Sequence, residues 1–123
     1  MPKVLAIDDD LAVLSLLENL LTLEGYEVRT ASDGLTGLRM LAEDPPDCVL
    51  LDVMMPGLDG HTVLARIRAR GTGRHVPVVM LTAASDDNNA WRAWQGGVDY
   101  FLAKPFEIND LLRYLSELLV TVR

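Results

Sequence analysis

The chain alternates short, continuous apolar runs with longer segments whose apolar residues recur at helical spacing. The run KVLAI at 3–7 stops at three acids, and the run CVLLD at 48–52 ends in Asp52. Continuous apolar runs of this length are typical of strands that are covered on both faces of a parallel sheet. The pattern predicts five strands, at 3–7, 26–31, 48–52, 76–83 and 99–103.

Segments of helical period separate these strands. After the first strand, Leu14, Leu17, Leu20 and Leu21 share one helix face, and Gly25 is a suitable C-terminal stop. The predicted helices span 11–24, 33–44, 59–69, 85–97 and 107–122. The last of them carries one apolar stripe, made of Ile108, Leu111, Leu112, Leu115, Leu118 and Leu119.

Strict alternation of strand and helix with short connections predicts an α/β fold, a doubly wound parallel five-stranded sheet of the (βα)5 type. We expect the loop RGTGR at 70–74 to connect the third helix to the fourth strand. No internal repeat, low-complexity run or linker divides the sequence. Residues 1–123 are therefore expected to form a single domain.

The charge balance is acidic, with 18 acidic and 11 basic residues and a net charge of -7. A domain that binds a nucleic-acid duplex usually carries the opposite sign. The composition therefore argues against direct nucleic-acid binding by this chain. It favours cationic partners, including divalent metal ions.

Cysteine content and hydropathy indicate the compartment. Cys48 is the single cysteine of the chain, so an intramolecular disulfide is excluded and a reducing compartment is favoured. No apolar run approaches the roughly 20 residues that a membrane-spanning helix needs. The first ten residues, MPKVLAIDDD, lack the apolar region of a signal peptide. The sequence predicts a cytoplasmic location and no membrane association.

Polar residues follow the carboxyl ends of the strands, where open α/β sheets place their sites. The acids 8–10 follow the first strand, Asp52 ends the third, Thr82 lies near the end of the fourth, and Lys104 follows the fifth. Clustered carboxylates repel one another, and Mg²⁺, which prefers oxygen ligands, would neutralise them. Asp52 is then a candidate nucleophile toward a phosphoryl group. Lys104 could pair with Asp52 or an added anion, and the Thr82 hydroxyl could bind a new oxygen.

Four motifs resemble the response-regulator receiver domain of bacterial two-component signalling. They are AIDDD at 6–10, LLDVMMPGLDG at 50–60, VVMLTA at 78–83 and YFLAKPF at 100–106. Their order and spacing match the family over essentially the whole chain. The resemblance implies a flavodoxin-like receiver fold with sheet order 2-1-3-4-5. It also implies a signalling switch in a phosphorelay rather than an enzyme.

The resemblance also implies roles for individual residues. Asp52 would be the phosphoacceptor, charged by a histidine kinase or a phosphotransfer protein. Asp8 and Asp9 would form the acidic pair that binds Mg²⁺, or Mn²⁺ as an alternative, with Asp9 as a direct ligand. Asp52 itself and the backbone carbonyl of Met54 would complete the protein ligands.

On the other side of the predicted site, Thr82 would bind the phosphoryl oxygens and move toward them. Lys104 would contact the phosphoryl group, and its bond to Pro105 could be cis, which X-Pro bonds tolerate. Phe101 stands at the family's aromatic switch position. These residues would link the state of the phosphoacceptor to the face formed by the fourth helix, fifth strand and fifth helix.

That face would contact a downstream protein, a fused output domain or a second copy of the chain. Trp91 and Trp94 lie three residues apart on the predicted fourth helix, and Tyr100 and Phe101 are on the fifth strand. An exposed aromatic patch would suit a partner, because Trp is enriched at interface hot spots. The alternative is that one or both tryptophans pack on the core.

Other functions with related architecture are open to comparison. A flavodoxin-like cofactor binder is disfavoured, because three carboxylates after the first strand would repel a phosphate. A haloacid-dehalogenase-type phosphatase would need an acid two residues after the nucleophile, where this chain has Met54. A degenerate receiver that binds partners without being phosphorylated remains the alternative to the switch.

Two further positions bear on the lifetime of a phosphoryl group. Met54 and Ala84 each lie two residues after a predicted site residue, Asp52 and Thr82. In the family that the chain resembles, these positions flank the path of the attacking water. Neither side chain can position water as an acid or amide could, so slow hydrolysis is expected.

Overall fold

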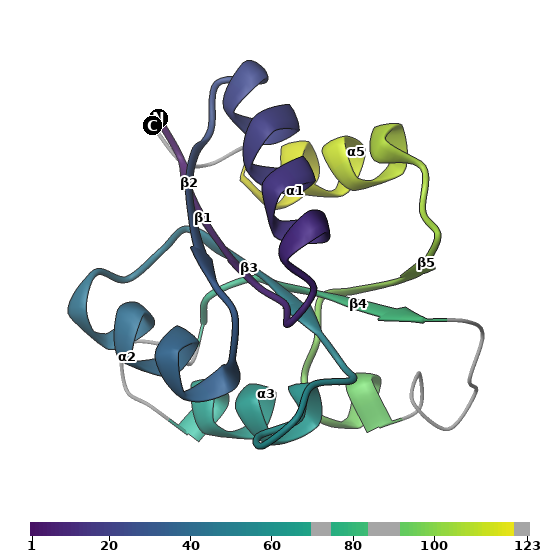
Figure 1. Cartoon of the computed structure of the whole chain (residues 1–123). Coiled ribbons are helices and arrows are strands. Elements are labelled where there is room, and N and C mark those ends of the chain that lie inside the picture. The colour runs from purple at the N-terminus through teal and green to yellow at the C-terminus, as the bar shows by residue number, and fades with distance from the viewer. Residues whose placement is uncertain (70–74, 84–91, 120–123) are drawn as a thin grey trace.

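Five strands form one parallel sheet in the order β2-β1-β3-β4-β5 (Figure 1). They appear in a computed structural model, which describes residues 1–69, 75–83 and 92–119. The strands are β1 (Lys3–Ile7), β2 (Glu27–Ala31), β3 (Cys48–Asp52), β4 (Val78–Ala83) and β5 (Tyr100–Lys104). The predicted fold class and sheet order are confirmed.

Helices cover both faces of this sheet. They are α1 (Leu11–Leu23), α2 (Gly34–Glu43), α3 (Gly60–Ala69) and α5 (Ile108–Leu118). Figure 1 shows α1 and α5 over one face and α2 and α3 over the other. Residues 92–95 are helical, where the end of the fourth helix is predicted. The start of that helix, with Trp91, and the predicted loop at 70–74 lie outside the described residues.

The central strand β3 shows why the apolar runs are continuous. Every residue of β3 is buried. Val49 and Leu51 belong to the core under α2 and α3, whereas Cys48 and Leu50 belong to the core under α1 and α5. Because successive side chains of a strand point to opposite faces, β3 is apolar at each position that the helices on its two sides cover, and only its last residue, Asp52, is polar. Cys48 is a buried member of the core.

Local signals fix where the elements begin and end. Asp10 caps α1, and its side chain accepts hydrogen bonds from the amides of Ala12 and Val13. Asp10 therefore serves the helix. Gly25, which follows α1, has a φ of 93°, a conformation that glycine adopts without strain. β4 begins two residues later than predicted, after Pro77, whose carbonyl accepts the amide of Val49.

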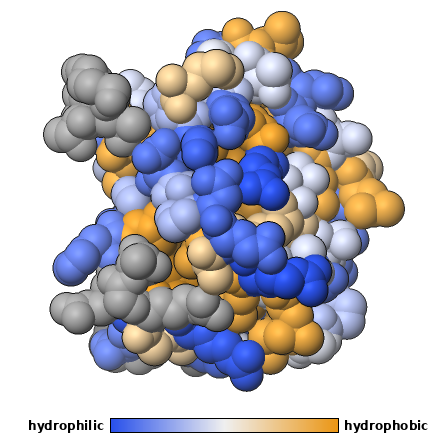
Figure 2. Space-filling model, turned by 90° about the vertical axis from the view of Figure 1, so that its left-hand side faces the viewer, coloured by the Kyte–Doolittle hydropathy of each residue, from blue (hydrophilic) through white to orange (hydrophobic). Residues whose placement is uncertain are grey.

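The edge strand β2 is protected by charges. Asp44, after α2, lies 2.9 Å from the Lys3 ammonium and 3.0 Å from the Arg29 guanidinium. The hydrogen bond from Lys3 is the main cause that lowers the pKa of Asp44. Figure 2 shows the side of β2 and α2, where hydrophilic residues form a broad band between smaller hydrophobic areas. Charged groups on an edge strand disfavour pairing with another sheet.

The face of α1 that packs on the sheet can be tested with two leucines of the same helix. Leu21 is fully buried, whereas Leu23 is 83% exposed. We expect Leu21→Ala to lower the free energy of unfolding by about 2–5 kcal/mol, because it leaves a cavity. Leu23→Ala should change it by less than about 0.5 kcal/mol. Urea denaturation of both variants measures this, and equal losses would contradict the assigned face.

Candidate functional site

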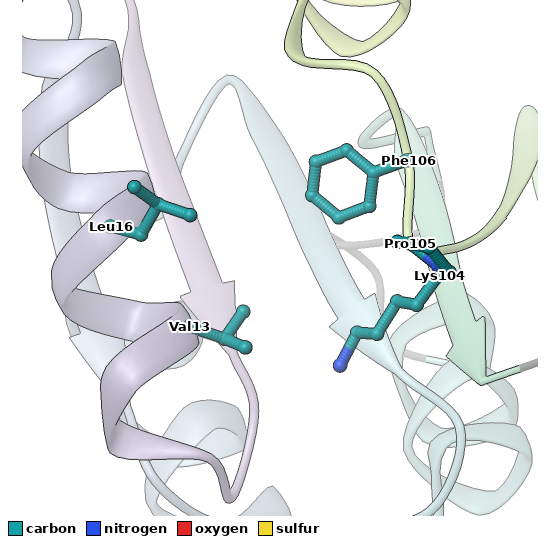
Figure 3. Close-up of a pocket in the computed structure, with 5 residues that line it drawn as sticks. All are labelled: Val13, Leu16, Lys104, Pro105 and Phe106. Carbon is teal, nitrogen blue, oxygen red and sulfur yellow. The ribbon is translucent and has the colours of Figure 1, made fainter.

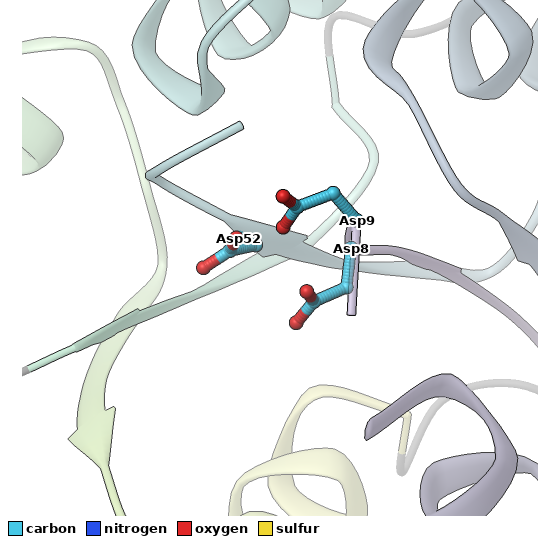
Figure 4. A group of neighbouring side chains, drawn as sticks. All are labelled: Asp8, Asp9 and Asp52. Atoms are coloured by element: carbon cyan, nitrogen blue, oxygen red, sulfur yellow. The ribbon is translucent and has the colours of Figure 1, made fainter. Parts of the chain in front are cut away.

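Three carboxylates meet at the carboxyl ends of β1 and β3, which are paired neighbours in the sheet. Oxygens of Asp8, Asp9 and Asp52 all lie within 4.8 Å of one another. Figure 4 shows the three side chains gathered at this edge. Asp8 and Asp52 are 2% and 3% exposed, while Asp9 is exposed. The cluster therefore has two buried acids and one that faces solvent.

Strand alternation explains why these side chains and Lys104 converge. Asp8, Asp52 and Lys104 each lie two positions after a residue whose side chain faces α1 and α5. Those residues are Ala6, Leu50 and Leu102. Because the side-chain period of a strand is two, the polar residues emerge on the same side of the sheet, at its carboxyl edge.

The Lys104 ammonium bridges two of the acids. Its nitrogen lies 2.7 Å from Asp8 Oδ2 and 3.3 Å from Asp52 Oδ1. The predicted pairing with Asp52 is confirmed, and the closer pairing with Asp8 is one that sequence reasoning missed. The sequence feature that could have indicated this pairing is the alternation of side chains along β1, which places Asp8 on the same side of the sheet as Asp52. The bond between Lys104 and Pro105 is cis.

Burial and charge shift the acidity of this group of residues. Burial raises the pKa of Asp52 to about 6, and the nearby charge of Asp8 adds to the rise, while Lys104 opposes it. Burial alone would lower the pKa of Lys104, but the hydrogen bond to Asp8 and the charge of Asp52 outweigh it and raise that pKa. The site thus keeps its ammonium charged and disfavours the ionised form of Asp52.

Thr82 lies on β4, the strand next to that of Asp52. Asp52 pairs in register with Leu81 of β4, so Thr82 lies one residue further toward the edge. Its side chain is fully buried. Its Oγ1 has no hydrogen-bond partner within the described parts of the chain. A buried hydroxyl without a partner costs about 1–3 kcal/mol, so this atom is suited to bind an added oxygen.

The loop from Val53 to Asp59 leads from β3 to α3. It leaves β3 with the amide of Val53 bound to the carbonyl of Leu81 at 3.0 Å. Met54 follows, and its side chain is 65% exposed. Gly57 has a φ of 78°, so the turn requires glycine there. The role of the Met54 carbonyl as a metal ligand stays a prediction.

An apolar groove of about 380 Å³ opens next to Lys104. Figure 3 shows Val13 and Leu16 of α1 on one side and Lys104, Pro105 and Phe106 on the other. The ammonium of Lys104 extends from this wall toward the carboxylates. Sequence reasoning did not anticipate the groove, because its walls lie about 90 residues apart in the chain.

Tyr100, a predicted partner-face residue, is engaged within the chain. Its ring stacks on Tyr114 of α5 with centroids 4.1 Å apart and planes 5° apart. Its hydroxyl donates a hydrogen bond to Glu117. This contact joins β5 to α5, and sequence reasoning missed both α5 partners. Their signal in the sequence is weak, because the polar tips of Tyr114 and Glu117 do not distinguish a partner within the chain from solvent; Tyr114 is partly buried against the core, and Glu117 is exposed.

The other predicted partner-face residues differ in exposure. Phe101 is half-buried and packs against the core under α2 and α3. Trp94 is 55% exposed, and the alternative that one or both tryptophans pack on the core stays a prediction. Trp91 lies outside the described residues.

Comparison with known proteins identifies the family. The model of the response regulator receiver domain matches residues 4–116. The chain is 47% identical over 112 residues to the response regulator PleD of Caulobacter vibrioides, covering 91% of this chain and 24% of PleD. It is 41% identical over 117 residues to the response regulator MprA of Mycobacterium leprae, covering 95% of this chain and 50% of MprA. The chain belongs to the response regulator receiver domain family.

A solved structure agrees with this assignment. The receiver domain of the sensor histidine kinase PA1611 from Pseudomonas aeruginosa matches with a TM-score of 0.90 and 31% identity, covering 98% of each chain. That structure has a magnesium ion coordinated in its active site cleft. The present chain spans half or less of the length of the two curated relatives. No helix in the described part of the chain combines the length and apolar character that crossing a bilayer requires.

The raised pKa of Asp52 gives a testable pH dependence in metal-free buffer with EDTA. The folded state binds the Asp52 proton more tightly than the unfolded state, whose pKa is near 3.8. The resulting stabilisation is complete below that value and is lost as pH rises through about 6. Asp52→Asn should therefore raise the free energy of unfolding at pH 8, by about 1–3 kcal/mol. The gain should shrink toward pH 4.5.

Urea denaturation at the two pH values measures this difference. Asp59→Asn is the matched control with the opposite sign, because the hydrogen bond from the Thr62 amide lowers the pKa of Asp59. It should destabilise the protein by nearly the same amount at both pH values, because both lie above the lowered pKa of Asp59 and above the unfolded value of 3.8. A stability gain for Asp52→Asn that is equal at both pH values would contradict the raised pKa of Asp52.

Proposed function

We propose that this chain is a phosphoacceptor switch of a two-component phosphorelay, with Asp52 as the residue that is phosphorylated. The observation that carries the proposal is the cluster of Asp8, Asp9 and Asp52, in which the Lys104 ammonium pairs with Asp8 and Asp52. The partnerless hydroxyl of Thr82 beside them supports it. Membership of the receiver family supports it further.

In the proposed reaction, a carboxylate oxygen of Asp52 attacks the phosphorus of a phosphohistidine on a histidine kinase or phosphotransfer protein. The new O–P bond forms an acyl phosphate, the P–N bond breaks, and the histidine nitrogen takes up a proton. Asp52 is suited to this role because Lys104 holds it at the end of a fully buried strand. Fixed placement of the attacking atom lowers the barrier by reducing the entropy lost at the transition state.

The donor set fits a hard divalent cation. The three clustered groups are carboxylates, and Mg²⁺ and Mn²⁺ prefer oxygen ligands. Asp8, Asp9, Asp52 and the backbone carbonyl of Met54 would hold the ion. When bound, the ion supplies charge neutralisation for the phosphoryl oxygens and the carboxylates. The structure of the PA1611 receiver domain, with its magnesium ion, supports this assignment.

After transfer, the negative charge next to Lys104 lies on the phosphoryl oxygens rather than on the Asp52 carboxylate. We infer that Lys104 then contacts a phosphoryl oxygen and that the Thr82 hydroxyl donates a hydrogen bond to another. Such a bond would satisfy the buried Oγ1 atom. Thr82 would move toward the phosphoryl group, and Phe101, which is half-buried, would change its position as the switch.

The signal would leave through the face of the fourth helix, β5 and α5. Trp91, Trp94, Tyr100 and Phe101 are the residues that we assign to this face. The partner would be a downstream protein, a fused output domain or a second copy of the chain. The acidic charge of -7 argues against direct contact with nucleic acid. We further propose that residues 1–123 form one receiver domain and that it acts in the cytoplasm.

Phosphorylation of Asp52 is tested by intact-protein mass spectrometry after incubation with acetyl phosphate and Mg²⁺. We expect one phosphoryl adduct, and no adduct on Asp52→Asn or in the presence of EDTA. An adduct that persists in Asp52→Asn would contradict the choice of residue. No adduct on the wild-type protein, with Mg²⁺ binding established separately, would favour a degenerate receiver that binds partners without phosphorylation.

The lifetime of the acyl phosphate tests the role of Met54. Its thioether cannot orient an attacking water, and we expect Met54→Asn to shorten the half-life of the phosphoryl group at least several-fold. The decay of the phosphorylated mass peak after removal of acetyl phosphate measures this. Leu23→Asn, at an exposed position 83% accessible at the far end of α1, is the control and should leave the half-life unchanged. Equal half-lives for all three proteins would refute the assignment.

A further inference from the structure

The start of α3 rests directly on the backbone that carries Asp52. The Gly60 amide donates a hydrogen bond to the Val53 carbonyl at 2.9 Å. A Cβ atom on Gly60 would clash with the Asp52 carbonyl oxygen and would lie 2.7 Å from Val53 Cα and 3.0 Å from the Asp52 carbonyl carbon. These neighbours are backbone atoms, which cannot rotate away as a side chain can.

The same loop is held from its other side by α2. A Cβ atom on Gly34 would lie 3.0 Å from Leu58 Cβ and 3.2 Å from the Leu58 carbonyl oxygen, as well as 2.7 Å from Val63 Cγ2. Asp59, the residue after Leu58, accepts the Thr62 amide at 2.8 Å and so joins the loop to α3. The seven-residue loop from Val53 to Asp59 is therefore approached closely at its start by Gly60 and near its end by Gly34.

We propose that Gly60 is a positioning residue for the site, and that Gly34 supports it. Gly60 allows α3 to approach the backbone of Asp52 and Val53, and Gly34 allows α2 to approach Val63 of α3 and Leu58 of the loop. Together the two glycines set the course of the loop 53–59. This inference rests on the proposed function, in which the Met54 carbonyl of this loop faces a bound cation. The strand β3 is paired on both sides, with β1 and with β4. A displacement that begins at Gly60 must therefore be taken up by the loop.

The variant Gly60→Ala tests the proposal, with Gly25→Ala as the matched control. Gly25 has a φ of 93° and no atom within 4 Å of an added Cβ. Alanine there strains the backbone and lowers stability without touching the site, because Gly25 follows α1 at the end remote from Asp10. Mn²⁺ binding, measured by electron paramagnetic resonance of the free ion, separates positioning from stability.

We expect Gly60→Ala to weaken Mn²⁺ binding about tenfold or more, the range typical of residues that orient metal ligands. Gly25→Ala should bind Mn²⁺ as the wild type does, although urea unfolds both variants earlier. Binding by folded Gly60→Ala that equals the wild type would overturn the proposal. Where Gly60→Ala does not fold, Gly34→Ala decides in the same way, because its added Cβ meets side chains and one carbonyl at longer range.

A second measurement distinguishes failure of this inference from failure of the proposed function. Amide NMR spectra of wild type and Gly60→Ala report the loop without any metal. Shifts at Asp52, Val53 and Met54 support the positioning role, even when the wild type binds no Mn²⁺ and the metal site itself is refuted. Shifts confined to α3 beyond Gly60 would overturn the positioning role, whatever the metal affinity.

Discussion

The arrangement depends on keeping two nearly buried carboxylates next to one ammonium. Asp8 and Asp52 emerge from adjacent strands, and Lys104 reaches both of them from β5. In this sheet β4 lies between β3 and β5, so about 10 Å of backbone spacing separates the strand of Lys104 from that of Asp52. A long side chain is needed to cross that distance. A long basic side chain such as lysine therefore suits this position.

The charge of Lys104 does not fully neutralise the carboxylates of the site. One ammonium faces three carboxylates, so the site keeps an excess of negative charge that burial makes costly for Asp52. The cost disfavours its ionised form and raises its pKa, and any cation that enters relieves it. The folded chain therefore holds an excess of negative charge at this site, at a cost in free energy, rather than a neutral set of groups. Binding of the divalent ion that we propose for this cluster would relieve this electrostatic strain.

Much of this could be predicted from the sequence, and the reasons for success and failure are physical. Continuous apolar runs located the strands, and the shared carboxyl edge of a parallel sheet brought Asp8, Asp52 and Lys104 together. The closer partner of Lys104 was not predicted, because the choice between Asp8 and Asp52 depends on side-chain geometry rather than on strand order. The close approach of Gly60 to Asp52 was also hidden. A glycine in a sequence does not reveal which backbone will lie against it.

The alternation of side chains along the strands also places the residues of the proposed switch on opposite sides of the sheet. Asp8, Asp52 and Lys104 are in phase with the residues that face α1 and α5. Thr82 is in the opposite phase, because Val78 and Met80 of the same strand belong to the core under α2 and α3. Phe101 packs against that second core and pairs in register with Met80. A movement of Thr82 toward Asp52 would therefore change the packing on the side of the sheet where Phe101 is half-buried. The groove lined by Val13 and Leu16 beside Lys104 lies on the α1 side, opposite to the side that holds Phe101.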